Sequence, residues 1–555
     1  MKGFIAPAVC LLIFAGIAAA GAQARTFYVS QSGSDAADGM SPESAWKTIV
    51  KVNGTIFQPG DRILLEAGRT YAGGFVLRPG FAADHVTLST YGAGQATIRS
   101  DDLPCVSAIN LADVHIDNLN CVGSGAIANS AFGIVVQNSL EGDIKLDGPT
   151  ITRNSVRGYG DNGIMVSGAR GASGFVNITI SSNTVHDVTG REANVHMDSA
   201  CIRVSVDGAY PDPSGHHNVH VSDNTVYNCV GQPNAADNTG SGILLSEVTD
   251  AVITHNIVHD TGSRNRRCGG PNGVWVYSSA HVLIEYNESY RNGTDVRAGG
   301  CDGNGFDLDG GVTDSIVQYN YSHDNHGADF LVYAFHDSAQ PQWKNNVFRY
   351  NIGENSARGL DIANDHDQPM TGCYIYNNSF YGPVSIVTEK ADAGIDCVIA
   401  NNVFYVDRPI FSSSPAFEVP HPSHIVMVGN NYTGRGLWRW DGGTYKTLPE
   451  WRAATGQELL KGADTGSSMD PKLLDAGRGG TVGGHIPEKL RAYHLQTTSP
   501  MLGAGIDLHA LYGIDVGPHD YFGAPVPDAS GRYDVGAGGA YPHESASAAE
   551  GTDLH

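Results

Sequence analysis

The sequence has few basic residues for its length. Its 555 residues include 34 lysines and arginines against 58 aspartates and glutamates, which gives a formal net charge of −24 at pH 7. A surface this acidic repels phosphate backbones and anionic headgroups, so it argues against nucleic acids and anionic membranes as partners. The same charge disfavours a polyanionic substrate unless calcium or a local basic patch neutralises it.

Long apolar runs are also scarce. One run lies between Val9 and Ala20, it is too short to be a membrane anchor, and no second hydrophobic span follows it. The small-x-small triplet Ala22-Gln23-Ala24 after this run is typical of a signal-peptide cleavage site. We therefore expect a signal peptide over residues 1–24, a mature chain from Arg25, and a secreted or periplasmic protein.

Segments of helical period long enough to connect parallel strands are missing from the middle of the chain, where short β-branched runs are split by Gly, Asn and Asp. An asparagine recurs there in the frame apolar-x-x-Asn-x-apolar, at intervals of 24 to 41 residues. Such a period predicts a solenoid of stacked parallel coils with a ladder of hydrogen-bonded asparagines at one turn. The recurring residues are Asn154, Asn183, Asn224, Asn256, Asn287, Asn320, Asn351, Asn378, Asn402 and Asn430.

No two cysteines have the CxxC spacing that is typical of metal sites, so the sequence gives no support for a metal site. Eight cysteines remain after the signal peptide, an even number that predicts disulfides in an oxidising compartment. Cys373 and Cys397 form the favoured pair because each lies five residues before a ladder asparagine, whereas free buried thiols stay an alternative for Cys201 and Cys229. The sequential pairs are Cys105 with Cys121, Cys201 with Cys229, Cys268 with Cys301, and Cys373 with Cys397.

The N-terminal region has the signals of a capped solenoid. Ser41 followed by Pro42 predicts the start of a helix that continues to about Val52, and residues 59–65 predict a turn and a buried strand. The phrases YVSQSGSDAADGMSPESAWKTI and PGDRILL resemble the cap and first coil of the pectate-lyase-like superfamily, secreted carbohydrate-active enzymes with a right-handed parallel β-helix. The resemblance implies an all-β solenoid with an N-terminal capping helix.

The C-terminal part resembles the closing segment of the same superfamily in its run GIDVGPHDYFGAPVPDASGRYDVGAGGAY. Before it, residues 437–455 predict a lateral insertion with a short helix near residues 448–454. We expect one domain with caps: signal peptide 1–24, N-terminal cap and first coils 25–100, β-helix core 101–435, C-terminal insertion and closing segment 436–541, and a disordered tail 542–555.

Aligning the strands of successive coils predicts an outward face that mixes acids and aromatics, as a sugar-binding groove requires. The stretch CDGNGFDLDGG, residues 301–311, is central to it because apolar and acidic residues alternate there. One outward column contains Met165, Arg203, Leu244, Trp275, Asp307, Leu331 and Asp361. Two residues further along, the outward column contains Ser167, Ser205, Ser246, Tyr277, Asp309, Tyr333 and Ala363.

Three acids on this face predict glycoside hydrolysis. Strand spacing places Asp307 and Asp361 about 9–10 Å apart, and Asp307 and Asp309 about 6–7 Å apart. Both separations are compatible with the roughly 6.5–9.5 Å of inverting glycosidases, in which one acid protonates the leaving oxygen and the other activates water. Asp307 and Asp361 are the stronger candidates, because an aspartate in the middle of a strand is disfavoured without a function.

Other residues near these acids predict substrate contacts. Trp275, Tyr277 and Tyr333 are expected to stack on sugar rings. Arg203, His336, Asp337, Asp365 and His366 are expected to line the floor or rim. Asp302, Asp309 and Asp365 lie near strand ends, so a role as turn residues is an equal alternative for each.

Two further function classes stay open. In a polysaccharide lyase, Asp302, Asp307 and Asp309, with Asp361, would hold Ca²⁺, which would neutralise a uronate. One pectate lyase family has a catalytic Lys where this chain has Asp307, so Tyr333, His336 or Lys390 would have to act as the base. A non-catalytic glycan-binding or adhesive β-helix is the third class. The hydrolase requires no cofactor, and we expect a monomer acting on a polysaccharide or oligosaccharide whose sugar and linkage the sequence leaves open.

Overall fold

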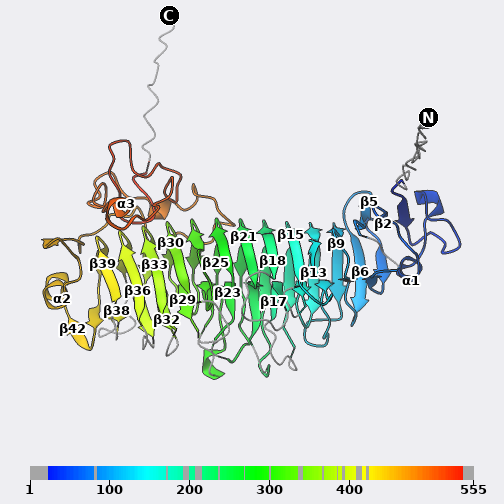
Figure 1. The fold of residues 1–555 in the computed structure, drawn as a ribbon, viewed down its shortest axis with the longest axis horizontal. Coiled ribbons are helices and arrows are strands. Elements are labelled where there is room, and N and C mark those ends of the chain that lie inside the picture. Colours follow the sequence, from blue (N-terminus) through cyan, green and yellow to red (C-terminus); the bar gives the residue numbers. More distant parts are fainter. Residues whose placement is uncertain are drawn as a thin grey trace, which may run out of the picture.

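The computed structural model is nearly all β-strand and forms one right-handed parallel β-helix (Figure 1). Each coil passes through three sheets, A, B and C, in that order, and their strands pair in parallel except at the C-terminal end, where β41 and β42 are antiparallel. The structure describes residues 23–80, 84–169, 173–191, 199–206, 215–235, 238–267, 269–298, 302–335, 342–364, 368–383, 386–389, 394–407, 415–419 and 424–541.

Sheet A faces the C-terminal part of the chain. Its strands are β1 (Thr26–Val29), β2 (Arg62–Glu66), β5 (Thr87–Tyr91), β8 (His115–Asp117), β12 (Thr150–Thr152), β15 (Gly174–Ser181), β18 (His216–Ser222), β21 (Val248–Thr254), β24 (Ala280–Glu285), β27 (Ile316–Gln318), β30 (Lys344–Arg349), β33 (Met370–Tyr376), β36 (Ile395–Ala400) and β39 (His424–Val428), with β11 (Lys145–Asp147) beside β15.

Sheet B follows sheet A in every coil. Its strands are β3 (Thr70–Ala72), β6 (Ala96–Asp101), β9 (Leu119–Gly123), β13 (Ser155–Tyr159), β16 (Thr184–Val188), β19 (Thr225–Cys229), β22 (Ile257–His259), β25 (Glu288–Tyr290), β28 (Tyr321–His323), β31 (Ile352–Glu354), β34 (Ser379–Gly382), β37 (Val403–Val406) and β40 (Asn431–Gly434).

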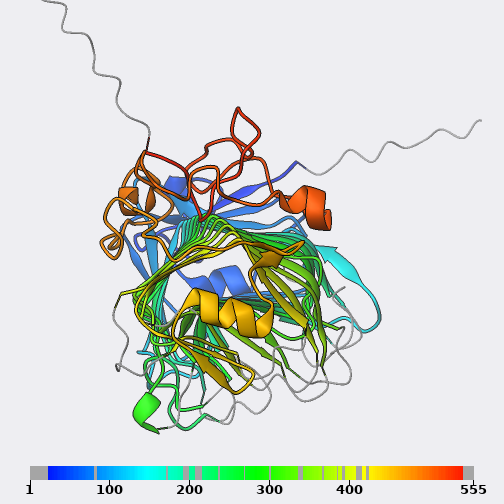
Figure 2. The same ribbon diagram turned by 90° about the vertical axis from the view of Figure 1, so that its left-hand side faces the viewer.

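Sheet C holds the predicted acids. Its strands are β4 (Phe75–Leu77), β7 (Val106–Ile109), β10 (Ile134–Asn138), β14 (Ile164–Gly168), β17 (Ser199–Val206), β20 (Thr239–Ser246), β23 (Asn272–Tyr277), β26 (Asn304–Leu308), β29 (Ala328–Ala334), β32 (Arg358–Asn364), β35 (Ile386–Glu389), β38 (Pro415–Val419), β41 (Leu437–Trp440) and β42 (Gly443–Tyr445). Turns on either side of these strands gather along one side of the solenoid (Figures 1 and 2).

The predicted asparagine ladder is confirmed and fixes the bend from sheet A to sheet B. Asn183 shows the pattern: its backbone N and its Nδ2 donate to Oδ1 of Asn224, at 2.9 and 3.0 Å, and Nδ2 also donates to the Ile151 carbonyl. Each ladder asparagine follows a residue with positive φ, from Arg153 at 55° to Gly429 at 72°. The side chain thereby satisfies backbone groups that the bend removes from the sheets.

The two ends of the solenoid differ from the sequence predictions in detail. Ser41 caps a helix as predicted, but that helix is a 3₁₀ turn, Pro42–Ser44, and α1 (Ile49–Asn53) begins separately after Thr48. A single helix to Val52 is wrong because the chain between them is extended and pairs with β1: Trp46 N donates to the Tyr28 carbonyl at 2.8 Å.

Residues 437–455 are not a lateral insertion. Strand β41 pairs in parallel with β38 and so belongs to sheet C, and α2 (Leu448–Thr455) covers the end of the last coil (Figure 2). Trp451 on α2 is completely buried, with its ring centroid 5.4 Å from Trp440 and 5.7 Å from Tyr432. Burial of this tryptophan closes the apolar core at the C-terminal end.

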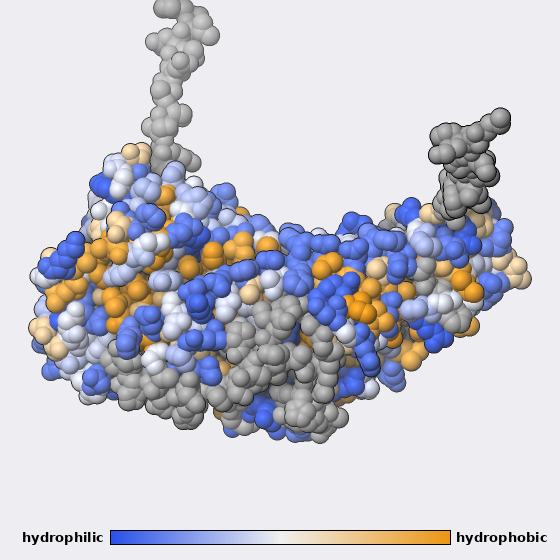
Figure 3. Space-filling model, in the orientation of Figure 1, coloured by the Kyte–Doolittle hydropathy of each residue, from blue (hydrophilic) through white to orange (hydrophobic). Residues whose placement is uncertain are grey.

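The closing segment, residues 469–541, lies along the outside of sheets A and B (Figures 1 and 2). It contains α3 (Leu508–Tyr512) and the 3₁₀ turn Arg491–Tyr493; a small hairpin, β43 (Leu459–Leu460) and β44 (Ala463–Asp464), precedes it. Apolar side chains gather over the C-terminal coils beside it (Figure 3), and there Leu508 and Ile514 pack with Tyr376 and Val428.

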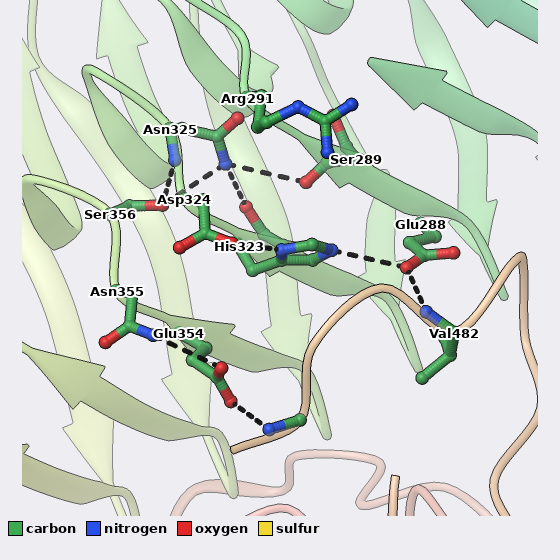
Figure 4. Close-up of polar contacts among 12 residues, drawn as sticks. Glu288, Ser289, Arg291, His323, Asp324, Asn325, Glu354, Asn355, Ser356 and Val482 are labelled. Carbon is green, nitrogen blue, oxygen red and sulfur yellow. Dashed lines mark hydrogen bonds and ion pairs between the residues drawn. The ribbon is translucent and has the colours of Figure 1, made fainter. Parts of the chain in front are cut away.

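Two buried carboxylates from sheet B hold the closing segment (Figure 4). Glu288 accepts hydrogen bonds from the backbone N–H groups of Val482, Gly483 and Gly484, at 2.6 to 2.8 Å, and lies 3.2 Å from Nε2 of His323. Glu354 accepts from Gly479 N at 2.9 Å and from the Tyr493 hydroxyl at 2.6 Å. The attachment is therefore polar and specific as well as apolar.

Three disulfides lie within the described residues: Cys105–Cys121, Cys201–Cys229 and Cys373–Cys397. Cys373 and Cys397 are register partners on β33 and β36, as predicted. The alternative of free thiols at Cys201 and Cys229 is wrong, because β17 and the next coil's β19 bring them together. Cys268 and Cys301 lie outside the described residues. None of the helices that the structure describes is long and apolar enough to span a bilayer.

Candidate functional site

The predicted outward columns are confirmed by the register of sheet C. Trp275 pairs with Asp307, Asp307 with Leu331, and Leu331 with Asp361. The alternating neighbours Phe306 and Leu308 point inward and belong to the core. Asp307 and Asp361 therefore project from the same side of sheet C, two coils apart, which corresponds to about 9–10 Å along the solenoid.

These outward side chains are buried rather than lying in an open groove. Asp307, Asp309 and Asp361 are 2%, 5% and 4% exposed, although none faces the core. Long turns flank the strands that carry the acids, and one of them contains the 3₁₀ turn Val296–Ala298 (Figure 1). The acids thus occupy a low-dielectric environment, in which electrostatic interactions are stronger than in water.

Asp307 lies in an environment that favours its neutral form. Burial raises the pKa of its carboxyl well above the ordinary value, and the charges of Asp309, Asp302 and Asp361 raise this pKa further. Its Oδ2 accepts a hydrogen bond of 2.7 Å from Nδ2 of Asn272. Its Oδ1 is buried and has no hydrogen-bond partner among the described residues.

Asp361 lies in an environment that favours its ionised form. Its Oδ2 is 2.8 Å from Nε of Arg358, three residues earlier on β32. An opposite charge at this distance stabilises a carboxylate. The two acids of one column thus have different neighbours, an amide for Asp307 and a guanidinium for Asp361.

Asp309 follows β26 and is held by two donors. The Trp275 indole Nε1 donates to its Oδ2 at 3.1 Å, and the Gly310 N–H donates to its Oδ1 at 2.7 Å. The second contact is that of a turn residue, and the first ties the carboxylate to the aromatic face. Asp309 therefore has the contact of a turn residue, and its catalytic role stays a prediction.

Two of the predicted aromatic residues, Trp275 and Tyr277, lie together on the N-terminal side of the acids. Trp275 and Tyr277 on β23 have ring centroids 5.3 Å apart, and both pack with Leu244 and Phe335. Tyr333 on β29 is only partly buried. Arg203 on β17 is buried in the same column as Trp275, with Leu244 between them. The structure thus places the predicted aromatics beside the acids, and Arg203 two coils away from Trp275.

Other predicted residues lie outside the described residues. These are His336, Asp337, Asp365, His366 and Lys390. Asp302 is described and lies before β26, where its Oδ2 accepts from Gly269 N at 2.5 Å and from Gly270 N, and its Oδ1 from Asn304 Nδ2 at 3.3 Å. These backbone contacts are those of a turn residue.

The sequence analysis missed three polar residues at the start of the sheet C strands. Asn272, Asn304 and Arg358 contact the acids or each other, and Asn272 pairs in register with Asn304. A signal was present: Asn272-Gly273-Val274-Trp275 and Asn304-Gly305-Phe306-Asp307 repeat one Asn-Gly pattern in adjacent coils.

The residues proposed as calcium ligands do not converge. Among the described residues, no three His, Cys, Asp or Glu side chains form a group with the geometry to hold a metal ion. Asp307 Oδ2 and both oxygens of Asp309 accept hydrogen bonds from amide, indole or backbone N–H groups, which occupy the positions that a cation would take. The donor set therefore does not fit the calcium site of the lyase alternative.

Comparison with known proteins finds β-helix proteins that are similar to this chain at low sequence identity. No family model matches the sequence. A lacto-N-biosidase from Bifidobacterium longum is 24% identical over 482 residues, which cover 68% of this chain and 28% of that protein. The chain thus spans less than a third of the length of this relative.

Solved structures give weaker likenesses. A GH136 lacto-N-biosidase from Eubacterium ramulus has a TM-score of 0.48 and 17% identity, covering 67% of this chain and 68% of that chain. XylC in complex with xylose has a TM-score of 0.48 and 10% identity, covering 92% and 98%. The strand pairing itself establishes the parallel β-helix fold that the sequence resemblance predicted.

Proposed function

We propose that this protein is a glycoside hydrolase in which Asp307 is the general acid and Asp361 the general base. The observation that carries the proposal is the difference between their environments: Asp307 is buried beside a neutral amide and three acids, whereas Asp361 forms an ion pair with Arg358. A neutral carboxyl and an ionised carboxylate on one face are what glycoside hydrolysis requires.

The spacing favours inversion of configuration. In that reaction Asp307 donates its proton to the glycosidic oxygen as the bond from this oxygen to the anomeric carbon breaks. Asp361 accepts a proton from water, whose oxygen forms the new bond to the anomeric carbon from the opposite side. A separation of about 9–10 Å between register partners two coils apart leaves room for this water, whereas a retaining pair lies about 5–5.5 Å apart.

The relative suggests the first substrate to test. Because the chain is similar to a lacto-N-biosidase, a lacto-N-bioside is the first candidate, and other β-linked and α-linked oligosaccharides follow. The aromatic cluster of Trp275 and Tyr277 beside the acids supports a carbohydrate ligand, since aromatic side chains pack on the apolar faces of sugars. We further propose a secreted or periplasmic monomer, for which the disulfides are consistent with an oxidising compartment.

The test is hydrolysis of a panel of chromogenic glycosides, including a lacto-N-bioside, by the wild type and by Asp307→Asn and Asp361→Asn. Each substitution keeps the shape and removes the proton chemistry, so we expect turnover to fall by about 10²–10⁴-fold. The matched control is Asp324→Asn, which changes an exposed acid in the turn after β28 and keeps the wild-type rate. Full activity of both site variants, or products with a conjugated double bond, would contradict the assignment.

A further inference from the structure

We propose that Asn272 and Asn304 are positioning residues that fix the Asp307 carboxyl in one orientation, so that Oδ1 is the atom that delivers the proton. This inference rests on the proposed function of Asp307 as the general acid. It is carried by a chain of hydrogen bonds across three successive strands of sheet C, β23, β26 and β29.

The contact with Asp307 assigns the two carboxyl oxygens. Nδ2 of Asn272 donates to Oδ2 of Asp307 at 2.7 Å. In a protonated carboxyl group the carbonyl oxygen accepts and the hydroxyl oxygen carries the proton. A donor fixed at Oδ2 therefore makes Oδ2 the carbonyl oxygen and places the proton on Oδ1.

Asn304 prevents the Asn272 amide from turning over. Oδ1 of Asn272 accepts from Nδ2 of Asn304 at 2.8 Å and from the Asn304 backbone N at 3.4 Å. If the Asn272 amide flipped, its oxygen would face Oδ2 of Asp307 and its NH₂ group would face two donors. Both contacts would be repulsive, so the amide of Asn272 has one favourable orientation.

The next strand in turn holds Asn304. Its Oδ1 accepts from the backbone N–H of Ala328 at 2.6 Å. Gly327 precedes that N–H, and a Cβ at this position would lie 2.3 Å from Oδ1 of Asn304. The backbone of β29 thus anchors the Asn304 amide through a close approach that only glycine allows.

Oδ1 of Asp307 is the end of this chain. It is buried, and no hydrogen-bond partner for it exists in the described part of the protein. A buried polar oxygen without a partner destabilises a folded protein, so its presence requires a reason. Transfer of a proton to the glycosidic oxygen of a substrate supplies that reason.

The same column distinguishes the acid from the base. The backbone N–H of Ala328 donates to Asn304, and Ala328 pairs in register with Arg358 on β32. The column thus presents amides beside Asp307 and a guanidinium beside Asp361. Asn272 and Asn304 therefore orient the Asp307 carboxyl, and Arg358 favours the ionised form of Asp361.

The test compares Asn272→Ala, which removes the donor to Asp307, with Asn304→Ala, which leaves that donor in place but releases its orientation. The matched control is Asn292→Ala, which removes an equally buried Asn–Asn hydrogen bond, to Asn325, on the sheet B side. The readouts are the pH dependence of kcat/KM with a chromogenic lacto-N-bioside, or the best substrate of the panel, and the infrared C=O band of protonated Asp307, identified by its loss in Asp307→Asn.

We expect Asn272→Ala to lower kcat by up to about 100-fold, as for a misplaced catalytic group. The basic limb of the pH profile and the midpoint of the infrared titration should both move to higher pH, because the lost donor also stabilised the carboxylate form. Asn304→Ala should produce the same shifts with smaller size, and Asn292→Ala should lower the Tm without moving either readout.

Unchanged pH profiles and infrared midpoints in both Asn272→Ala and Asn304→Ala would overturn the positioning role. If Asp307→Asn alone abolishes hydrolysis, the proposed function survives that result. Absence of hydrolysis by the wild type on every substrate would contradict the proposed function instead, while the infrared midpoints still decide whether the two asparagines control Asp307. If Asn272→Ala does not fold, Asn304→Ala gives the decision alone.

Discussion

Asp307 and Asp361 occupy the same register column of sheet C, with Leu331 between them on β29. This single relationship gives two carboxyl groups a common direction and a separation of about two strand spacings. Their neighbours then favour different charges, since burial beside Asp309, Asp302 and Asp361 favours the neutral form of Asp307, whereas Arg358 pairs with Asp361. This difference affects the pH dependence of activity, whereas the buried glutamates that bind the closing segment and end the asparagine ladder affect stability.

The pH dependence of kcat/KM should be bell-shaped. The acid Asp307 must be protonated, so activity falls as the pH rises through its pKa, which burial and three neighbouring acids raise well above the ordinary value of about 3.9. The base Asp361 must be ionised, so activity falls again at low pH. Initial rates across a buffered pH series measure both limbs. A basic limb near pH 4 would contradict the role of Asp307.

Arg358→Gln should narrow this profile from the acidic side. Without the guanidinium, the ionised form of Asp361 loses its partner, and a higher pH is needed to ionise it. The acidic limb should therefore move to higher pH while the basic limb, which reports Asp307, moves little. Arg291→Gln is the control, because Arg291 pairs with Asp260 on the surface and does not touch either acid. A shift of the basic limb alone would refute the assignment.

Asp307→Asn should stabilise the protein while inactivating it. The folded-state pKa of Asp307 is raised, so the wild type loses stability as the pH rises from the unfolded pKa of about 3.9 through the folded value. The variant does not titrate and escapes this loss. Its advantage should be absent near pH 3 and grow by about 1.4 kcal/mol for each unit of pKa shift. The Tm of the wild type and of the variant should be measured at pH 3 and at a pH above the folded-state pKa of Asp307. A Tm difference between the two proteins that is equal at both pH values would contradict the prediction.

Features of the fold and the site that repeat in every coil could be predicted from the sequence, whereas contacts between distant segments could not. The asparagine ladder and the columns of sheet C were predictable, because each coil repeats the same hydrogen bond and the same alternation. The burial of Asp307 was not, since the repeat does not indicate which residues cover the outward face of sheet C. The contact of Glu288 with Val482 spans 194 residues, and nothing in either segment indicates the other.

The attachment of the closing segment should be most stable in mildly acidic solution (Figure 4). Burial opposes both charges, yet hydrogen bonds from His323 and from the backbone lower the pKa of Glu288, and bonds to Asp324 and Glu288 raise the pKa of His323. The stabilisation from Glu288 is present above about pH 4.3 and disappears as the pH falls through its lowered folded pKa. The stabilisation from His323 is complete below about pH 6.5 and disappears as the pH rises through its raised folded pKa.

Hydrogen exchange of residues 479–484 measures this attachment directly. Protection should be greatest between about pH 4.5 and 6.5, and Glu288→Gln should reduce stability by about 3–5 kcal/mol, because it removes the buried one of the two carboxylates that pair with His323. Arg291→Gln breaks the exposed ion pair between Arg291 and Asp260. It should reduce the stability by less than about 1 kcal/mol. Protection that is independent of pH would show that apolar contacts alone hold the segment.

Glu458→Gln, an isosteric change, should destabilise the protein although Glu458 lies after the last coil. It replaces an asparagine as the final member of the ladder: its Oε1 accepts from Asn430 N, Asn430 Nδ2 and the Tyr432 hydroxyl, and its Oε2 from Gly429 N and Thr465 Oγ1. All five partners are donors, so the site requires two acceptor oxygens. In Glu458→Gln an NH₂ group must face donors, which should lower the free energy of unfolding by about 1–3 kcal/mol. Urea unfolding of this variant beside Glu450→Gln, an exposed glutamate on α2, measures the difference, and equal stability of the two would show that the ladder does not depend on its last acceptor.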